Sequence, residues 1–422
     1  MLSCLHPPLG RRLRGLLCIV VAALALGAHA AAAQTAAPKL PVTGAALLAA
    51  GQTEPLWSYD GDRELAIAST TKLMTFLVVI QHVKNLSTEY TQNDWVPQAA
   101  DSQIGLKPGE RMSVFDLLWA MMLPSADDAA EDLAYNTADG SVPRFISWMN
   151  ADARALGLRH THYSTPTGLD TPGNYSSPDD LVRLAAYMVR HHPLFRRIVS
   201  SYQATVSSAT GQTYHLVNTD TLLDEDHWIE GIKTGHTTDA GYVLVSEGRR
   251  DGLTLIASVL GTDSEYERDQ SALALLNWGF ANFHEIQPVR AGDPFEKVLV
   301  AGGDNAALVV ARTGYRTAVR WGTSVRLVLK GPKRLTGPMP KGAVVGSVTV
   351  LLGGHPRAHL PLVLARALPA PPAQGFLHSV TGVITLVVLA LLIATAIMVG
   401  VVRRRNPQRV KQGSARTRVP PR

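Results

Sequence analysis

Residues 376–402 form an apolar stretch without a charged side chain, and three arginines, 403–405, follow it at once. The stretch is long enough to span a bilayer, because a helix needs about 20 apolar residues to cross the hydrocarbon core. By the positive-inside rule, the arginines predict that the tail, residues 403–422, stays in the cytoplasm. A buried core helix is the alternative, but the acid-free tail has no apolar face with which to fold around it. Residues 34–375 are therefore expected outside the cytoplasm.

The N-terminus has the three parts of a secretory signal. A region with three arginines precedes an apolar run at residues 16–26, and small residues occupy 27–33. We expect a signal peptide over residues 1–33, cleaved near Ala33; an uncleaved anchor is the alternative. The two cysteines of the chain, Cys4 and Cys18, both lie in this segment. The mature protein therefore has no disulfide, cysteine nucleophile or cysteine metal ligand.

The positive charge of the chain is concentrated at its two ends. The net charge is +6, but the first 33 residues contain three arginines and no acid, and the last 20 contain eight Lys/Arg and no acid. The remaining residues are therefore net negative, which argues against a nucleic-acid partner. An apolar content of 46% is enough for a sizeable core.

The region from residue 36 to 285 alternates irregularly between helical and strand patterns. Residues 45–50 and 56–59 predict a hairpin, and the helix that begins at Ser69 has no polar face over two turns, which is typical of a helix buried between layers. This mixture predicts an α/β sandwich, in which helices flank an antiparallel sheet. The other predicted elements are helices at 113–135, 141–156, 178–191 and 266–283 and strands at 242–247 and 253–260.

The sequence pattern changes after residue 286, from mixed helices and strands to short strands alone. Short β-rich runs at 295–300, 306–310, 324–329, 344–352 and 360–364 are separated by Gly, Pro and charged turns. They predict a small all-β domain over residues 287–368. The Pro-rich residues 369–375 predict a stiff linker to the membrane helix.

Ser69 and Lys72 form a Ser-x-x-Lys string at the start of the buried helix. Residues three apart on a helix are neighbours, and a helix N-terminus favours a developing negative charge. A lysine accepts a proton only when it is neutral, so its pKa must be lowered by burial or by a nearby cation, for which Lys233 is a candidate. The pair predicts a serine nucleophile with a lysine base, and the alternative, an unrelated pair on a solvated face, conflicts with the apolar helix.

Two further strings follow in order, Ser125-Ala126-Asp127 and Lys233-Thr234-Gly235. The second precedes a predicted strand, where a lysine and a threonine hydroxyl can hold an anionic chain end and a glycine leaves room for the substrate backbone. By itself it also fits an ordinary turn. The three strings in this order resemble those of the serine-type D-Ala-D-Ala carboxypeptidases, which are low-molecular-mass penicillin-binding proteins.

The resemblance runs from about residue 45 to 283, and it implies a fold of the β-lactamase/transpeptidase type. Segments 68–75, 124–130 and 231–237 resemble the three motifs, and 164–170 with 175–177 resembles a further family segment. Residues 287–368 resemble the family's second domain less specifically.

Carried over residue by residue, the resemblance implies a role for each site residue. Ser69 would attack the carbonyl of the penultimate D-alanine, Lys72 would be the general base, and Ser125 would relay a proton to the leaving amine. Lys233, Thr234 and Arg268 would hold the terminal carboxylate beside Gly235. The backbone N–H groups of Ser69 and His236 would form the oxyanion hole. Water would then hydrolyse the acyl-enzyme, and β-lactams would acylate Ser69 as inhibitors.

Asp127 departs from the family pattern, which has asparagine at this position. An ionised carboxylate near Lys72 would favour the protonated lysine, which is the wrong state for a base. A protonated Asp127, a pair with Lys233 and a slower enzyme all remain open. We expect activity with a raised pH optimum.

Other functions have weaker support. His160-Thr161-His162 and His191-His192 lack the spacing of a metal site, so neither a metal nor a cofactor is expected. A class A β-lactamase needs a deacylating glutamate for which no convincing match exists, and Asp127 alone supports a non-catalytic wall-binding protein. The expected partners are a peptidoglycan stem peptide and the membrane. A D,D-endopeptidase would need the same residues and stays open.

Overall fold

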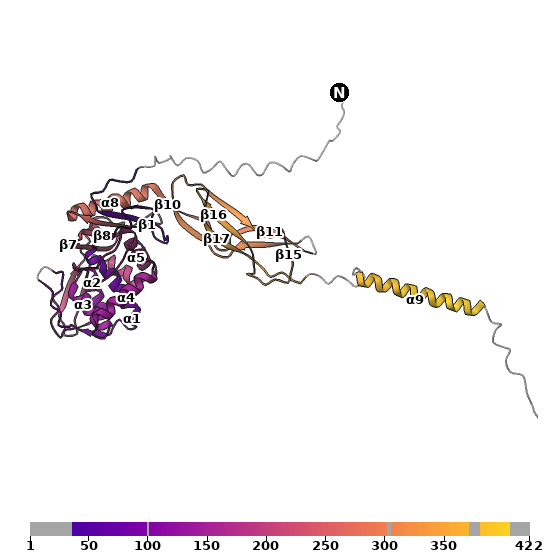
Figure 1. The fold of residues 1–422 in the computed structure, drawn as a ribbon, viewed down its shortest axis with the longest axis horizontal. Helices are drawn as coiled ribbons and strands as arrows, with labels where there is room; N and C mark the ends of the chain where they lie inside the picture. Colours follow the sequence, from indigo (N-terminus) through magenta and orange to yellow (C-terminus); the bar gives the residue numbers. More distant parts are fainter. Residues whose placement is uncertain (1–35, 99–100, 302–304, 371–379, 406–422) are drawn as a thin grey trace, which may run out of the picture. The chain divides into compact units, whose positions relative to one another are not determined.

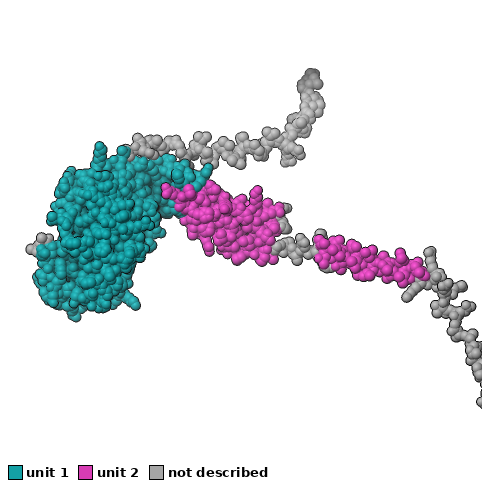
Figure 2. All heavy atoms as spheres, viewed as in Figure 1, with its two compact units in different colours: residues 1–288, 315–326, 351–355 teal, residues 289–314, 327–350, 356–422 magenta. Residues whose placement is uncertain are grey.

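The computed structural model describes residues 36–98, 101–301, 305–370 and 380–405. The predicted signal peptide, most of the linker and nearly all of the basic tail lie outside these residues. The described residues divide into two compact units, shown in teal and magenta in Figure 2. The first unit runs to Pro288 and also contains Tyr315–Arg326 and Leu351–His355; the rest of the described chain belongs to the second unit.

A five-stranded sheet in the order β2-β1-β9-β8-β7 forms the centre of the first unit. All neighbouring strands are antiparallel, and the predicted hairpin is present. The sheet confirms the expected α/β sandwich. The strands are β1 (Gly44–Ala49), β2 (Trp57–Tyr59), β7 (Ile229–Thr237), β8 (Gly241–Arg250) and β9 (Leu253–Thr262).

Both faces of this sheet are buried, because alternate residues of one strand point to opposite faces. In β1, Ala46 and Leu48 belong to the core between the sheet and the large helical layer. Ala45 and Leu47 belong to a second core, on the face covered by α8 (Glu265–Asn282). The sheet therefore lies between two helical layers, as Figure 1 also shows.

The large helical layer consists of α1–α6, and α1 (Lys72–His82) is its buried centre. The predicted helix over 113–135 is wrong, because it is two helices, α2 (Val114–Met122) and α3 (Asp127–Thr137). Ser125 separates them with φ +67°, a left-handed conformation that no helix interior contains. The other helices are α4 (Val142–Ala155), α5 (Pro178–His191) and α6 (Pro193–Val199).

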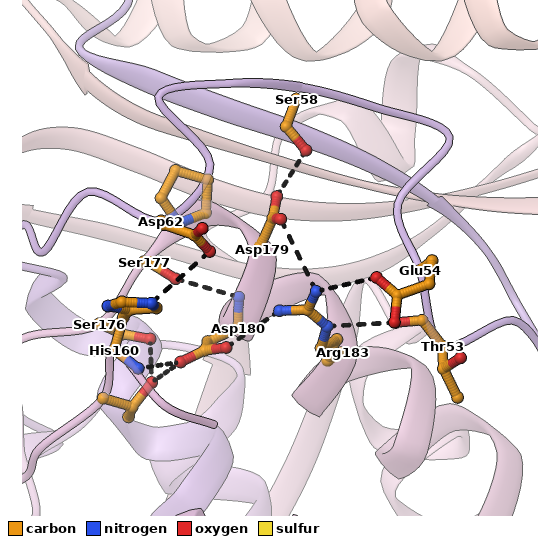
Figure 3. Close-up of polar contacts among 12 residues, drawn as sticks. Thr53, Glu54, Ser58, Asp62, His160, Ser176, Ser177, Asp179, Asp180 and Arg183 are labelled. Carbon is orange, nitrogen blue, oxygen red and sulfur yellow. Dashed lines mark hydrogen bonds and ion pairs between the residues drawn. The ribbon is translucent and has the colours of Figure 1, made fainter. Parts of the chain in front are cut away.

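A polar network at the start of α5 fixes both ends of the loop over residues 160–176 (Figure 3). The buried Asp180 carboxylate accepts hydrogen bonds from the backbone N–H of His160 at 2.8 Å and the Thr161 hydroxyl at 2.8 Å, and it pairs with Arg183. Thr161 in turn contacts the Ser176 hydroxyl at 2.8 Å. The loop between these fixed ends extends toward α1.

Short elements complete the first unit: β3 (Glu89–Thr91), β4 (Arg111–Ser113), β5 (Gln203–Ser207), β6 (Thr213–Val217), α7 (Leu222–Glu225), β10 (Phe283–Val289) and β13 (Tyr315–Arg320). α8 ends at Asn282, and β10 begins at Phe283, which the sequence pattern placed at the end of that helix. β10 pairs with β13, which the sequence pattern did not predict.

The second unit contains a six-stranded sheet in the order β14-β16-β17-β12-β11-β15. Its strands are β11 (Pro294–Val300), β12 (Ala306–Ala311), β14 (Val325–Lys330), β15 (Arg334–Leu335), β16 (Val344–Leu352) and β17 (His355–Leu364). The range 287–368 is rich in strands, as expected, but they do not form one sheet: β13 pairs with β10 in a separate two-stranded sheet, and compact unit 1 takes two short segments of the range.

The last described element, α9, spans Val380–Arg405. Its segment Val380–Val402 has a mean hydropathy of 2.8 and is only 6% buried. Among the described residues, it is the one helix long and apolar enough to cross a membrane, which fits the predicted span.

Candidate active site

Ser69 lies in a 3-10 turn, Ala68–Thr71, that leads directly into α1. The preceding residue, Ala68, has φ +45°, which is rare for a residue with a side chain. Strained backbone of this kind is concentrated at functional sites. The turn leaves the Ser69 side chain half-buried, whereas its neighbours Thr70 and Thr71 are fully buried.

Two glycines pack against the backbone of Ser69. A Cβ atom on Gly235 of β7 would lie 3.0 Å from the Ser69 nitrogen, and one on Gly168 would lie 2.0 Å from the Ala68 carbonyl oxygen. Only a residue without a side chain fits at either position. The first and third motifs, far apart in sequence, are therefore in direct contact.

Lys72 is completely buried, and its Nζ has three oxygen neighbours. These are Ser69 Oγ at 2.9 Å, Asp127 Oδ1 at 2.6 Å and the carbonyl oxygen of Thr167 at 2.7 Å. Thr167 belongs to the loop whose ends are fixed at Asp180. The structure thus brings the predicted nucleophile and base together, with Asp127, the residue that differs from the family pattern, as a third member.

Ser125 and Asp127 flank the N-terminus of α3. Asp127 is the first residue of the helix, and its backbone N–H donates to the Ser102 carbonyl at 2.7 Å. Ser125 is buried, and its hydroxyl has no hydrogen-bond partner among the described residues. The left-handed turn at Ser125 leaves this hydroxyl available for a ligand.

Lys233 is buried in β7, and its Nζ also lacks a partner among the residues that the structure describes. The next side chain, Thr234, contacts the Thr219 hydroxyl at 2.6 Å. An unpartnered buried ammonium is costly unless a ligand neutralises it. The strand therefore presents a cation suited to an anionic group.

Arg268 is buried in the protein, whereas the His236 side chain is exposed. Arg268 is 3% exposed, and its guanidinium pairs with Asp269 and Glu265, each at 2.8 Å, so it is already neutralised. It still interacts electrostatically with Lys233. The His236 side chain is exposed and lies against the Tyr242 ring, with the ring centroids 4.1 Å apart.

The protonation of Lys72 depends on two opposing effects. Burial lowers its pKa, and the Asp127 carboxylate raises it part of the way back. Burial likewise raises the pKa of Asp127, and Lys72 opposes that change. For Lys72, burial outweighs the effect of the Asp127 carboxylate, so an uncharged, base-competent Lys72 is accessible.

Three neighbouring groups titrate unusually close to neutrality. Burial, assisted by the charge of Lys72, lowers the pKa of Lys233 to about 7. Burial raises the pKa of Glu131, one turn after Asp127 on α3, to about 7. Burial, with the charge of Asp269, raises the pKa of Asp220 to about 6. Such a concentration of shifted groups is typical of active sites.

Sequence reasoning did not identify Thr167 or Asp220 as site residues. Thr167 contributes a main-chain carbonyl, so its residue type carries no signal, although the family-like segment 164–170 contains it. Asp220 is fully buried beside Lys233 and Arg268, and its Oδ2 has no partner within the described chain. No group of three or more His, Cys, Asp or Glu residues in the described ranges could hold a metal.

Comparisons with known proteins agree with this geometry. The sequence profile of the D-alanyl-D-alanine carboxypeptidase family matches residues 32–264. The D-alanyl-D-alanine carboxypeptidase DacA of Escherichia coli is 32% identical over 319 residues, which cover 72% of this chain and 77% of that protein. A D-alanyl-D-alanine carboxypeptidase of a Streptomyces species is 34% identical, over 62% of this chain and 94% of that protein.

Solved structures give the same result. Penicillin binding protein 5 from Haemophilus influenzae superposes with a TM-score of 0.67 at 28% identity, covering 79% of this chain and 99% of that one. A Streptomyces DD-transpeptidase superposes with a TM-score of 0.56 at 33% identity, covering 58% of this chain and all of that one. The second match is confined to a shorter part of this chain.

Proposed function

The chain belongs to the D-alanyl-D-alanine carboxypeptidase family of serine peptidases, and on that premise we propose which residues carry out its reaction. The enzyme acts in peptidoglycan metabolism. Ser69 is the nucleophile, and Lys72 is the base that takes its proton. The contact of 2.9 Å between Ser69 Oγ and Lys72 Nζ, inside a buried site, is the single observation that carries the proposal.

The substrate is a peptidoglycan stem peptide that ends in D-Ala-D-Ala. Its terminal carboxylate binds the buried ammonium of Lys233 and the Thr234 hydroxyl, because both groups can neutralise or hydrogen-bond an anion. Arg268 is already paired with Asp269 and Glu265. It can therefore attract the substrate carboxylate only at long range, unless it leaves one of these partners when the substrate binds.

The reaction proceeds through an acyl-enzyme. The developing oxyanion lies at the backbone N–H groups of Ser69 and His236, and donors of this kind lower the barrier more than any other single contribution. Ser125 passes a proton to the departing D-alanine, and its unpartnered hydroxyl supports this role. Water then hydrolyses the ester. β-Lactams would follow the same path and acylate Ser69.

The enzyme is attached to the membrane by Val380–Val402, with residues 34–375 on the extracytoplasmic side. The basic residues after the span support this orientation.

Release of D-alanine from a pentapeptide tests the proposed function. The wild-type enzyme should release D-alanine, and Ser69→Ala, which removes only one oxygen atom, should not. A crosslinked peptide dimer, assayed in parallel, separates a carboxypeptidase from a D,D-endopeptidase. Equal D-alanine release by Ser69→Ala would contradict the assignment of the nucleophile.

A further inference from the structure

Asp127 places a carboxylate in contact with the base of the reaction. Its Oδ1 lies 2.6 Å from Lys72 Nζ, and Nζ lies 2.9 Å from Ser69 Oγ. An amide of the same shape could hydrogen-bond to the lysine, but it could not accept its proton. The Asp127 carboxylate can therefore accept a proton from Lys72, which an asparagine at this position could not do.

The contacts of Lys72 define where its lone pair points when it is neutral. A neutral lysine has two N–H groups and one lone pair. The Thr167 carbonyl and the ionised Asp127 carboxylate can only accept, so the two N–H groups point to them. The lone pair is left for the Ser69 hydroxyl. Once Ser69 is acylated, it has no hydroxyl proton, and the same lone pair is available to a water molecule.

We propose that Asp127 is the terminal proton acceptor when water hydrolyses the acyl-enzyme, an inference that rests on the proposed function. As the water oxygen attacks the ester carbonyl, one water O–H bond breaks and a new N–H bond forms on Lys72. The Lys72 N–H bond that points to Asp127 breaks, and an O–H bond forms on the Asp127 carboxylate. Lys72 therefore stays neutral while the tetrahedral intermediate forms.

Collapse of the intermediate reverses these transfers. The bond between the carbonyl carbon and Ser69 Oγ breaks, and Oγ takes a proton from Lys72. Lys72 recovers its proton from Asp127, so the free enzyme is regenerated with the same number of protons. The net change is the addition of one water to the ester, with no other reactant.

The surroundings of Asp127 suit a proton acceptor. The charged groups that interact with it are Lys72 on α1, Lys233 on β7, Asp101 in the segment before β4, and Glu131 on its own helix. Burial raises the pKa of Asp127, which makes it a stronger base than a solvated carboxylate. The short contact with Lys72 is in the range of charge-assisted hydrogen bonds, along which a proton moves directly.

The lifetime of the acyl-enzyme tests this proposal. Full-length protein is acylated with labelled penicillin, excess drug is removed, and the label that remains on Ser69 is followed by mass spectrometry. Asp127→Asn keeps the shape of the side chain, and it should lengthen the lifetime by at least tenfold, since a positioned base contributes about 10²–10⁴-fold. An equal or shorter lifetime in Asp127→Asn would overturn the proposal.

Glu131→Gln is the matched control, because it removes a carboxyl one turn away that makes no hydrogen bond to Lys72 in the structure. It should leave the lifetime within a factor of two or three of wild type, and a lengthening equal to that of Asp127→Asn would overturn a specific role for Asp127. Hydroxylamine should release the label from both variants equally, which shows that their esters are intact and accessible. Failure of wild-type Ser69 to acylate would instead contradict the proposed function.

A measurement on the wild-type enzyme keeps the proposal testable if Asp127→Asn does not fold. The rate of label loss is measured in mixtures of H2O and D2O. Two protons that move together give a curved dependence on the deuterium fraction. A linear dependence, which indicates a single proton in flight, would overturn the relay.

Discussion

At the scale of single residues, the site is determined by a few buried charges. Ser69, Lys72, Ser125 and Lys233 were identified from their motifs, because their chemistry is encoded in residue type and spacing. From the sequence, we considered a contact of Asp127 with Lys72 and left a pair with Lys233 open; in the structure Asp127 pairs with Lys72. A sequence gives the distance along the chain between two groups, but not which of several partners a buried carboxylate will contact.

Replacement of Asp127 by Asn should shift the pH dependence of acylation to lower pH. The carboxylate raises the pKa of Lys72, so its removal lowers that pKa, and the neutral lysine is then present at lower pH. The acidic limb of the second-order acylation rate with labelled penicillin measures the shift. An unchanged limb, or one moved to higher pH, would show that Asp127 does not control the base.

The titration of Lys233 should limit activity in alkaline solution. Its pKa is lowered to about 7, so the free enzyme loses the cation that binds the substrate carboxylate as the pH rises through that value. We expect kcat/KM for a pentapeptide to fall above about pH 7, so Lys233 limits the raised pH optimum that the effect of Asp127 on Lys72 alone would give. A pentapeptide amide, which has no terminal carboxylate, is the control and should lack this decline. The same decline with both substrates would refute the assignment.

At the scale of secondary-structure elements, the sheet and most helices followed from periodicity. The predicted helix 178–191 coincides with α5, whereas the single helix predicted over 113–135 is wrong. Pro124, which cannot continue a helix, precedes the turn at Ser125 and was the sequence signal for the break. A serine in the left-handed region is held there by tertiary contacts that a sequence pattern does not contain. The carbonyl of Thr167 was missed for a similar reason, since a loop delivers it through its backbone.

Gly168→Ala tests whether this loop positions the nucleophile. The added methyl group would meet the Ala68 carbonyl oxygen at 2.0 Å, and the residue has φ +93°. We expect the free energy of unfolding to fall by about 1–3 kcal/mol. The rate of Ser69 acylation should fall more than in the control variant, because the turn before Ser69 must move. Gly211→Ala is the control: its φ is +86°, but nothing lies within 4 Å of the new methyl group. Equal acylation losses in the two variants would contradict this role.

At the scale of the whole molecule, the chain separates catalysis from attachment. The proposed catalytic residues all lie in the first compact unit, whereas the candidate membrane helix α9 has an apolar surface that is almost entirely exposed. The family, the fold and the membrane helix could all be predicted from the sequence. The two short segments that join unit 1 from the β-rich region could not, because the pattern of a strand does not state which sheet it will join.

A chain that ends after Ala370 should separate from membranes without losing its chemistry. It lacks α9, which contributes nothing to either hydrophobic core of the first unit. We expect it in the soluble fraction of a membrane sedimentation experiment, with an acylation rate within a factor of about two or three of the full-length enzyme. Continued sedimentation with membranes would contradict the assignment of the anchor.

The residue that penicillin acylates tests the role of Ser69 as the nucleophile most directly. Labelled penicillin is incubated with the full-length protein, and the modified peptide is mapped by mass spectrometry. We expect a single label on Ser69, lost in both Ser69→Ala and Lys72→Ala. A label on another residue, or an unmodified Ser69 in protein that is folded, would contradict this role.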